Sequence, residues 1–344
     1  MVEDKLRKHM LKVGVIGIGM MGSTHLDAYA KVKGVRVAAV ADLIEDRREG
    51  RTLTAGNVQG QSQGGVDFSQ FRKYDEGLRL IADPGLDVVD ICLPTPLHAR
   101  YAIAALKAGK HVLTEKPFAS NSRQAAQLVA VASHARPMLM CAMCMRFWPA
   151  WAWLKNTVDR KTYGKTLSAQ FRRVASHPGG PFYSNGRACG GAVLDLHIHD
   201  TDFINYCFGK PDAVFTRGYI RNTGRFDHLV TNYLYKNVPL VVAEGGWTMA
   251  PGFGFQMQYT VNFERATAVF DLAAQDQLTL FAGGRRSVVK VKPGMGYQHE
   301  IAYFVDCIRK RVRPQMVDPA SAALSVTIVE AEVKSARSGK PVRV

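Results

Sequence analysis

The sequence has no long apolar run. No apolar stretch approaches the ~18 residues of a membrane-spanning helix, so we expect no such span. The N-terminal MVEDKLRKHMLKVGVIG carries charge but no apolar stretch before a small-residue cleavage site. A signal peptide is therefore not expected, and residues 1–10 are predicted to be a solvated arm. Heptads and internal repeats are also missing, which argues against coiled coils and solenoids.

Cysteine is sparse, and its spacing excludes most metal and redox motifs. Six cysteines are scattered through apolar surroundings, as expected of reduced thiols in a cytoplasmic protein. Cys141 and Cys144 form a C-x-x-C, but PMLMCAMCM resembles a buried strand, in which this spacing sends the two side chains to opposite faces. No second pair follows. We therefore predict structural cysteines and no bound metal.

Acidic residues are few relative to basic ones. Lys and Arg number 45 against 29 Asp and Glu, for a formal net charge of +16. Such an excess can indicate nucleic-acid binding. Here, however, the basic residues are spread along the chain and the densest cluster, RKRVR at 309–313, is short. A merely basic surface, which can also attract anionic cofactors, is the favoured interpretation over nucleic-acid binding, and no nucleic-acid partner is expected.

What the sequence does contain begins with a nucleotide-binding pattern. LKVGVIGIG is predicted to be a buried strand, GIGMMG follows it, and STHLDAYAKV has helical character. In this context Gly17 permits a tight turn, Gly19 lets the backbone approach a pyrophosphate, and Gly22 allows close helix packing. The start of the helix attracts the phosphates.

An acid follows at the spacing expected for ribose recognition. Asp42 ends the next predicted strand, VRVAAVAD, and would bind the adenosine ribose hydroxyls. A 2′-phosphate would meet this carboxylate, so NAD is predicted over NADP. Arg47 and Arg48 weaken that preference without reversing it.

The alternation of strands and helices continues to about residue 146 and predicts an α/β, doubly wound parallel sheet. Such sheets bind ligands at the carboxyl ends of their strands. Three polar stretches fall there: PTPLH (94–98), EKP (115–117) and MRF (145–147). The Gly- and Gln-rich residues 52–70 are predicted to be a surface excursion without an assigned role.

The order of motifs resembles the Gfo/Idh/MocA family of glucose–fructose oxidoreductase and inositol dehydrogenase relatives. The resemblance rests on GIGMMG, PTPLHARYAIAALKAGKHVLTEKP, GGAVLDLHIHDTDF and the C-terminal segment from HEIAYFVDCIRK to SARSGKPV. It implies a Rossmann domain at 11–146, and at 147–344 an α+β domain whose large open, mostly antiparallel sheet forms homodimers or homotetramers. It also implies NAD(P)-linked chemistry on a sugar or polyol.

The resemblance also assigns residues. The catalytic set that it implies is Lys116, Asp195 and His199. The cofactor-binding set, taken with the glycine motif and Asp42, is Gly17, Ile18, Gly19, Met20, Met21, Gly22, Asp42, Pro94, Thr95, Pro96, His98, Glu115, Lys116 and Arg146.

The segment LDLHIHDTDFINYCFG is predicted to be one helix that ends at Gly209. At roughly 100° per residue, Asp195, His199 and Asp202 fall within about 60° of one another, whereas His197 and His199 diverge by about 160°. A two-histidine metal site is therefore not expected. His199 would accept the proton of a substrate hydroxyl, and Lys116 would stabilise the developing alkoxide. The order of the proton relay stays open, because Lys116 itself can carry the proton.

Several further residues keep two interpretations each. His197 stands where many family members have glycine, and either binds substrate or is a packed or solvent-facing histidine. Arg146 contacts nicotinamide or substrate, or forms a salt bridge at the domain crossover. His177 and Arg187 lie on a Gly/Pro-rich segment that either binds substrate or is a plain surface loop. Trp247 is expected to fill the sheet interface rather than stack on a sugar.

The function predicted is an NAD-dependent oxidoreductase acting on a hydroxyl of a sugar, cyclitol or sugar derivative. The alternative is a redox-assisted glycosidase or isomerase of the same family, which would share Lys116, Asp195 and His199. A non-catalytic nucleotide-sensing protein is the third candidate, and the retention of all three residues argues against it.

Overall fold

A computed structural model describes residues 10–52 and 65–344, and within these ranges no helix is long and apolar enough to cross a membrane. The predicted arm lies outside these ranges except for Met10, and so does most of the predicted excursion at 52–70. The chain forms two compact units, each with its own sheet.

The first unit contains a six-stranded, all-parallel sheet with the order β3-β2-β1-β4-β5-β6. Its strands are β1 (Leu11–Ile16), β2 (Val35–Ala41), β3 (Arg72–Tyr74), β4 (Val88–Ile91), β5 (His111–Glu115) and β6 (Leu139–Ala142). The strand order reverses direction between β1 and β4, which is where a doubly wound sheet opens a crevice for a ligand. The parallel Rossmann sheet predicted from the alternating pattern is confirmed.

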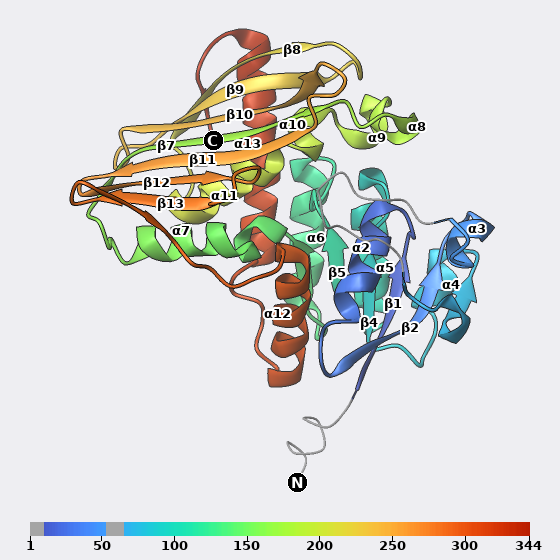
Figure 1. Cartoon of the computed structure of the whole chain (residues 1–344). Helices are drawn as coiled ribbons and strands as arrows, with labels where there is room; N and C mark the ends of the chain where they lie inside the picture. The colour runs from blue at the N-terminus through green and yellow to red at the C-terminus, as the bar shows by residue number, and fades with distance from the viewer. Residues whose placement is uncertain (1–9, 53–64) are drawn as a thin grey trace. The chain divides into compact units, whose positions relative to one another are not determined.

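Short helices surround this sheet (Figure 1). They are α2 (Met20–Tyr29), α3 (Glu45–Arg48), α4 (Gly77–Ile81), α5 (His98–Lys107), α6 (Ser122–His134) and α12 (Gly296–Lys310), with 3₁₀ turns η1 (Phe68–Gln70), η2 (Thr95–Leu97) and η3 (Cys144–Phe147). Cys141 lies in β6 and Cys144 in η3. Both are buried free thiols, as are Cys189, Cys207 and Cys307, whereas the free thiol of Cys92 is only partly buried.

The boundary between the units differs from the expected single break after residue 146. Residues 294–323, which include α12, belong to the first unit, and residues 120–122 belong to the second. The reason is packing. The buried face of α12 contacts η3 and α2, Tyr303 packs on Phe147 with ring centroids 5.3 Å apart, and a side chain at Gly296 would collide with the carbonyl of Cys144. A helix remote in sequence thus completes the first core.

The second unit contains a nine-stranded sheet with the order β14-β13-β12-β11-β7-β10-β9-β8-β15. Its strands are β7 (Thr166–Ser176), β8 (Ala213–Ile220), β9 (Phe226–Leu234), β10 (Leu240–Met249), β11 (Phe255–Phe263), β12 (Ala266–Asp271), β13 (Leu278–Ala282), β14 (Arg285–Val288) and β15 (Val342–Arg343). All recorded pairings are antiparallel except β10 with β7, which run parallel. The predicted mostly antiparallel sheet is confirmed.

Helices cover one face of this sheet (Figure 1). They are α7 (Pro149–Asp159), α10 (Ala192–Asp195), α11 (Ile198–Phe208) and α13 (Pro319–Ser338), whereas the short helices α8 (Gly180–Tyr183) and α9 (Gly186–Cys189) lie to the side, beyond the ends of the strands (Figure 1). The core between the layers is aromatic. Trp151 of α7 is fully buried, with ring centroids 4.7 Å from Phe203 of α11 and 5.4 Å from Tyr259 of β11.

The predicted continuous helix from Leu194 is interrupted. It forms α10 and α11, separated by Leu196 and His197, and ends at Gly209 as expected. At the break the N–H of His197 bonds to the carbonyl of Ala192, five residues back, and that of His199 bonds to Leu196, three residues back. The register of 100° per residue is therefore lost between Asp195 and His199.

Candidate functional site

The loop between β1 and α2 has the geometry of a dinucleotide cradle. Gly17 has a left-handed φ of +89°, and a Cβ there would lie 2.5 Å from the carbonyl oxygen of Cys92. A Cβ at Gly22 would collide with the carbonyl of Gly17. Any side chain at either position would therefore force the loop away from the sheet.

Gly19 serves a different purpose, because it faces open space. A Cβ at Gly19 would have no neighbour within 4 Å, and this residue is the N-cap of α2 without a side-chain cap. A ligand can therefore approach the backbone closely here, at the first N–H groups of α2. Ile18 is buried beneath the loop, whereas Met20 and Met21 are half-buried at its rim. These residues fit a pyrophosphate.

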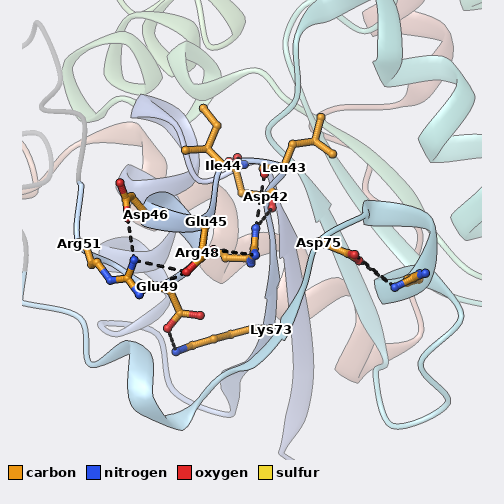
Figure 2. Close-up of polar contacts among 11 residues, drawn as sticks. Asp42, Leu43, Ile44, Glu45, Asp46, Arg48, Glu49, Arg51, Lys73 and Asp75 are labelled. Atoms are coloured by element: carbon orange, nitrogen blue, oxygen red, sulfur yellow. Dashed lines mark hydrogen bonds and ion pairs between the residues drawn. The ribbon is translucent and has the colours of Figure 1, made fainter.

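Asp42 lies at the end of β2, against the glycine loop. Its carboxylate accepts the N–H of Ile18 at 2.7 Å and that of Ile44 at 2.8 Å. The guanidinium of Arg48 lies within 3.4 Å of the carbonyl oxygens of Asp42 and Leu43 (Figure 2). The predicted ribose-binding acid is therefore beside the cradle, with one arginine next to it.

The charged side chains around α3 are mostly paired with one another. Arg51 bonds to Asp46 at 2.8 Å and contacts Glu45, and Lys73 pairs with Glu49 at 2.5 Å (Figure 2). This pairing keeps the local charge near α3 balanced, despite the basic excess of the chain.

The segment from Pro94 to His98 forms η2 and the start of α5. Pro94 and Pro96 are exposed, Thr95 is buried, and His98 is 1 % exposed. The ring nitrogens of His98 lie 2.7 Å from the carbonyl oxygen of Pro117 and 2.6 Å from that of Leu93. Burial lowers the pKa of His98, although both carbonyls favour the charged form. The neutral ring donates to one carbonyl at a time and joins this loop to the segment after Lys116.

Glu115 and Lys116 lie at the carboxyl end of β5. Glu115 is 5 % exposed and Lys116 is half-buried. Oε2 of Glu115 accepts the backbone N–H of Lys116 at 2.8 Å, so the carboxylate fixes the backbone that carries the lysine.

Arg146 is held within the first unit. It is 1 % exposed, and its guanidinium donates to the carbonyl of Met316 at 2.8 Å and to the hydroxyl of Ser321 at 2.9 Å. These bonds fasten η3 to the residues that follow α12. They support a structural interpretation in place of nicotinamide or substrate contact.

Asp195 and His199 lie in the second unit, on either side of the break between α10 and α11. Asp195 is the last residue of α10, His199 lies in the first turn of α11, and both are half-buried. Their neighbours are buried and have structural partners. Asp200 forms a bidentate pair with Arg173, and Asp202 accepts the hydroxyl of Ser325 at 2.8 Å.

His197 is fully buried between the helix break and the sheet. A side chain at Gly245 of β10 would collide with its ring, so the glycine makes the space that the imidazole fills. Its Nε2 lies 3.2 Å from the hydroxyl of Tyr233, which donates to Glu332 at 2.7 Å. These contacts favour the packed histidine over the substrate ligand.

Trp247 packs under the segment that leads to Asp195. It is 1 % exposed, its indole N–H donates to Asp227 at 2.9 Å, and its ring lies 5.6 Å from that of His177. Nδ1 of His177 accepts the N–H of Gly179. Trp247 thus fills the space between the sheet and these loops, as predicted.

Arg187 lines a pocket of about 440 Å³ in the second unit, together with Ser184, Asn185, Gly186, Thr223, Gly224 and Arg225. Two guanidinium groups give this pocket a positive charge.

Sequence reasoning missed two buried carboxylates. Asp227 holds the loop between β8 and β9, and Asp90 of β4 pairs with His25 of α2 at 2.8 Å. An acid within the apolar run LDVVDICLP was the available signal for Asp90, because a buried carboxylate requires a partner.

Comparison with known proteins identifies the family of this chain. Residues 11–143 match the model of an oxidoreductase family with an NAD-binding Rossmann fold, and residues 151–269 match the GFO/IDH/MocA C-terminal domain. The chain belongs to the Gfo/Idh/MocA oxidoreductase family. The match covers both units, so the resemblance seen in the motifs is confirmed.

Named relatives of this Gfo/Idh/MocA chain include sugar and cyclitol dehydrogenases. The chain is 30% identical over 209 residues to myo-inositol 2-dehydrogenase of Thermotoga maritima, which is 60% of this chain and 58% of that protein. It is 29% identical to levoglucosan dehydrogenase of Pseudarthrobacter phenanthrenivorans, over 59% and 53% of the two chains. These alignments thus span little more than half of each relative. The NAD⁺-dependent scyllo-inositol 2-dehydrogenase of Bacillus subtilis is 24% identical over 98% and 97%.

Solved structures share the fold of this family member. A levoglucosan dehydrogenase in complex with NADH and levoglucosan superimposes with a TM-score of 0.84 at 21% identity, over 97% of this chain and 99% of the other. An oxidoreductase from Agrobacterium radiobacter in complex with NAD⁺, L-tartaric acid and magnesium gives 0.82 at 19%, over 97% and 98%.

Proposed function

We propose that this protein is an NAD-dependent dehydrogenase that acts on a CH–OH group of a sugar, a cyclitol or a sugar derivative. The observation that carries the proposal is the cradle of Gly17, Gly19 and Gly22 with Asp42 beside it, in a chain of an oxidoreductase family. The names of the relatives supply the substrate class, since they include inositol and levoglucosan dehydrogenases.

The proposed reaction needs two transfers. When bound, NAD⁺ accepts the hydride from the substrate carbon, and the hydroxyl oxygen loses a proton as the carbonyl forms. His199 accepts this proton, because imidazole titrates near neutral pH. Asp195 orients the hydroxyl or the imidazole, and Lys116 stabilises the developing negative charge on oxygen. The proposal requires these three groups to act on one carbon.

The proposed cofactor contacts follow the geometry of the first unit. Gly17 to Gly22 hold the pyrophosphate, Asp42 binds the adenosine ribose, and residues 94–98 with Glu115 and Lys116 lie along the nicotinamide half. Arg146 and His98, which belong to the proposed cofactor-binding set, are each anchored by hydrogen bonds to backbone carbonyls beside this surface. Asp42 favours NAD over NADP because its carboxylate repels a 2′-phosphate.

The second unit supplies the proposed substrate pocket and an oligomer contact. Arg187 is proposed as a substrate contact because it lines the basic pocket, and His177 because it borders the same loops. The side of the sheet away from the helices carries exposed apolar side chains, among them Val230, Leu234, Leu240 and Phe281. A homodimer or homotetramer through this face is proposed. The six free thiols support a cytoplasmic location.

The test is a panel of sugars and cyclitols incubated with NAD⁺ and followed by NADH absorbance. Lys116→Ala and His199→Ala should each lower kcat by about 100-fold or more while NAD binding is kept. Lys107→Ala, at an exposed position at the end of α5, is the matched control and should leave kcat unchanged.

Two results would contradict the proposal. Unchanged turnover in both Lys116→Ala and His199→Ala would remove the assigned roles. Release of product from glycosides without net NADH would select the redox-assisted glycosidase instead.

A further inference from the structure

A buried charged cluster lies inside the first unit. It is formed by His25 of α2, Asp90 of β4 and Glu115 of β5, and none of the three is more than 5 % exposed. Nδ1 of His25 lies 2.8 Å from Oδ2 of Asp90, and Nε2 lies 3.1 Å from Oε1 of Glu115. The Nε2 contact lacks the alignment of a hydrogen bond, so its attraction is that of an ion pair.

The ring can serve both carboxylates only in its charged form, because neutral imidazole has one N–H. Burial alone lowers the pKa of His25, but the charge of Asp90 and that of Cys92, together with the hydrogen bonds to both side chains, outweigh it, and the pKa is raised well above its usual value. Burial alone raises the pKa of Glu115, but neighbouring His25 and then Lys116 outweigh it, and the pKa is lowered. The cluster therefore holds an imidazolium between two carboxylates.

Three other titratable groups face this cluster: Tyr29, Cys92 and Glu300. Burial raises the pKa of each, and the charge of Asp90 adds to the effect in all three. Tyr29 and Cys92 are therefore neutral near pH 7, and Glu300 is shifted toward its neutral form. The cations beside Glu115 are His25 and, from the next residue, Lys116.

Glu115 links this buried cluster to Lys116. While Oε1 faces His25, Oε2 accepts the backbone N–H of Lys116 at 2.8 Å. On the other flank, the ring of His98 lies 2.7 Å from the carbonyl oxygen of Pro117. A buried imidazole thus holds the chain on each side of Lys116.

We propose that His25 is a positioning residue for Lys116, which it orients through the carboxylate of Glu115, with Asp90 holding the imidazolium in place. The proposal rests on the proposed dehydrogenase function for its kinetic consequence. Its structural part, that His25 sets the environment of the Lys116 ammonium, stands on the contacts within the first unit.

The kinetic test is a double-mutant cycle. Asn at position 25 places its side-chain amide near the former position of Nδ1, so the contact with Glu115 is lost. Gln is longer and reaches toward the former position of Nε2, so it still offers an N–H donor to Glu115. His25→Asn should lower kcat by about 10- to 100-fold with the Kd for NAD changed less than about 3-fold, and His25→Gln should lose less. In a Lys116→Ala background, His25→Asn should change kcat less than about 2-fold, because both act through one group. His134→Asn, at an exposed site at the end of α6, is the matched control.

A second measurement needs no substrate. The rate of reductive methylation of Lys116 by formaldehyde and cyanoborohydride is followed by peptide mass spectrometry. In His25→Asn the unpaired charge of Glu115 retains the proton on the lysine, so methylation of Lys116 should slow at least about 3-fold, while exposed Lys107 stays unchanged. If the parent enzyme is inactive on every polyol, the proposed function is wrong. The methylation rate of Lys116 would still decide whether His25 positions Lys116.

Three results would overturn the proposal. The first is that His25→Asn lowers kcat by the same factor in the parent enzyme and in the Lys116→Ala variant. The second is methylation of Lys116 at the parental rate. The third is that the parent protein binds one equivalent of zinc and the His25→Asn variant does not. Such a result would make the cluster a metal site, since ligand atoms of His25, Asp90 and Cys92 lie within 4.8 Å of one another. If His25→Asn does not fold, Glu115→Gln keeps the shape of the side chain, severs the ion pair and should give the same non-additivity.

Discussion

Asp227 offers the sharpest test of how the second unit holds its loops. Its Oδ2 accepts three backbone N–H groups, from Arg221 at 2.9 Å, Asn222 at 2.7 Å and Thr223 at 3.0 Å. Its Oδ1 accepts the Thr223 hydroxyl at 2.7 Å and the indole N–H of Trp247 at 2.9 Å. One carboxylate therefore fixes both the loop after β8 and the tryptophan beneath the His177 segment.

The magnitude follows from what Asn can replace. Asn at position 227 keeps one acceptor oxygen, which can still accept the three backbone N–H groups. Its NH₂ group then stands in place of Oδ1 and cannot accept the indole N–H of Trp247. An orphaned buried donor costs about 1–3 kcal/mol, and the three remaining bonds lose their charge assistance at roughly 0.5–1 kcal/mol each. We expect the free energy of unfolding of the second unit to fall by about 2.5–6 kcal/mol at pH 7.

The effect should also depend on pH. Burial raises the pKa of Asp227, but the hydrogen bonds from Thr223, Arg221 and Asn222 outweigh it, and the pKa in the folded protein is lowered. Such a group contributes its full stability above its unfolded pKa of about 3.9 and loses it as pH falls toward the folded value. The difference between parent and Asp227→Asn should therefore shrink below about pH 4.

The assay is urea denaturation followed by tryptophan fluorescence, because all four tryptophans lie in the second unit. Asp276→Asn is the control, since Asp276 is 43% exposed and pairs with exposed Arg286, and surface pairs contribute about 0–1 kcal/mol. A loss below about 1 kcal/mol at pH 7, or a difference that stays constant from pH 7 to 3, would refute the reasoning.

Two further predictions concern other carboxylates. Arg173→Met leaves Asp200 buried without its bidentate partner and should lower the free energy of unfolding in urea by about 3–5 kcal/mol. The double variant Arg173→Met with Asp200→Leu should recover most of this loss. An equal loss in both variants would show that the unpaired charge is not the cause. Asp42→Ser should shift the ratio of the NADP and NAD dissociation constants about tenfold toward NADP, because Arg48 then meets the 2′-phosphate without the carboxylate; titration calorimetry showing an unchanged ratio would contradict this.

Locally encoded features were predicted well. The glycine motif, the alternation of strands and helices that predicted the parallel sheet, and the stop of α11 at Gly209 each depend on residues close together in the chain. Position 202 shows the limit of this approach. Helical spacing alone grouped Asp202 with Asp195 and His199, but its carboxylate is buried and accepts a hydrogen bond from Ser325, which lies on α13. No pattern in one helix reveals which surface a distant helix will cover.

The sequence by itself determined the nucleotide cradle, because φ at Gly17 and the close approach at Gly22 exclude side chains whatever surrounds them. Tertiary structure decided the rest of the candidate site. Arg146 is held by acceptors that the residues after α12 supply, and His197 is a core residue because Gly245 on a distant strand leaves room for it. The physical reason is that buried polar groups must find partners, and the fold alone decides which distant groups are near enough to serve.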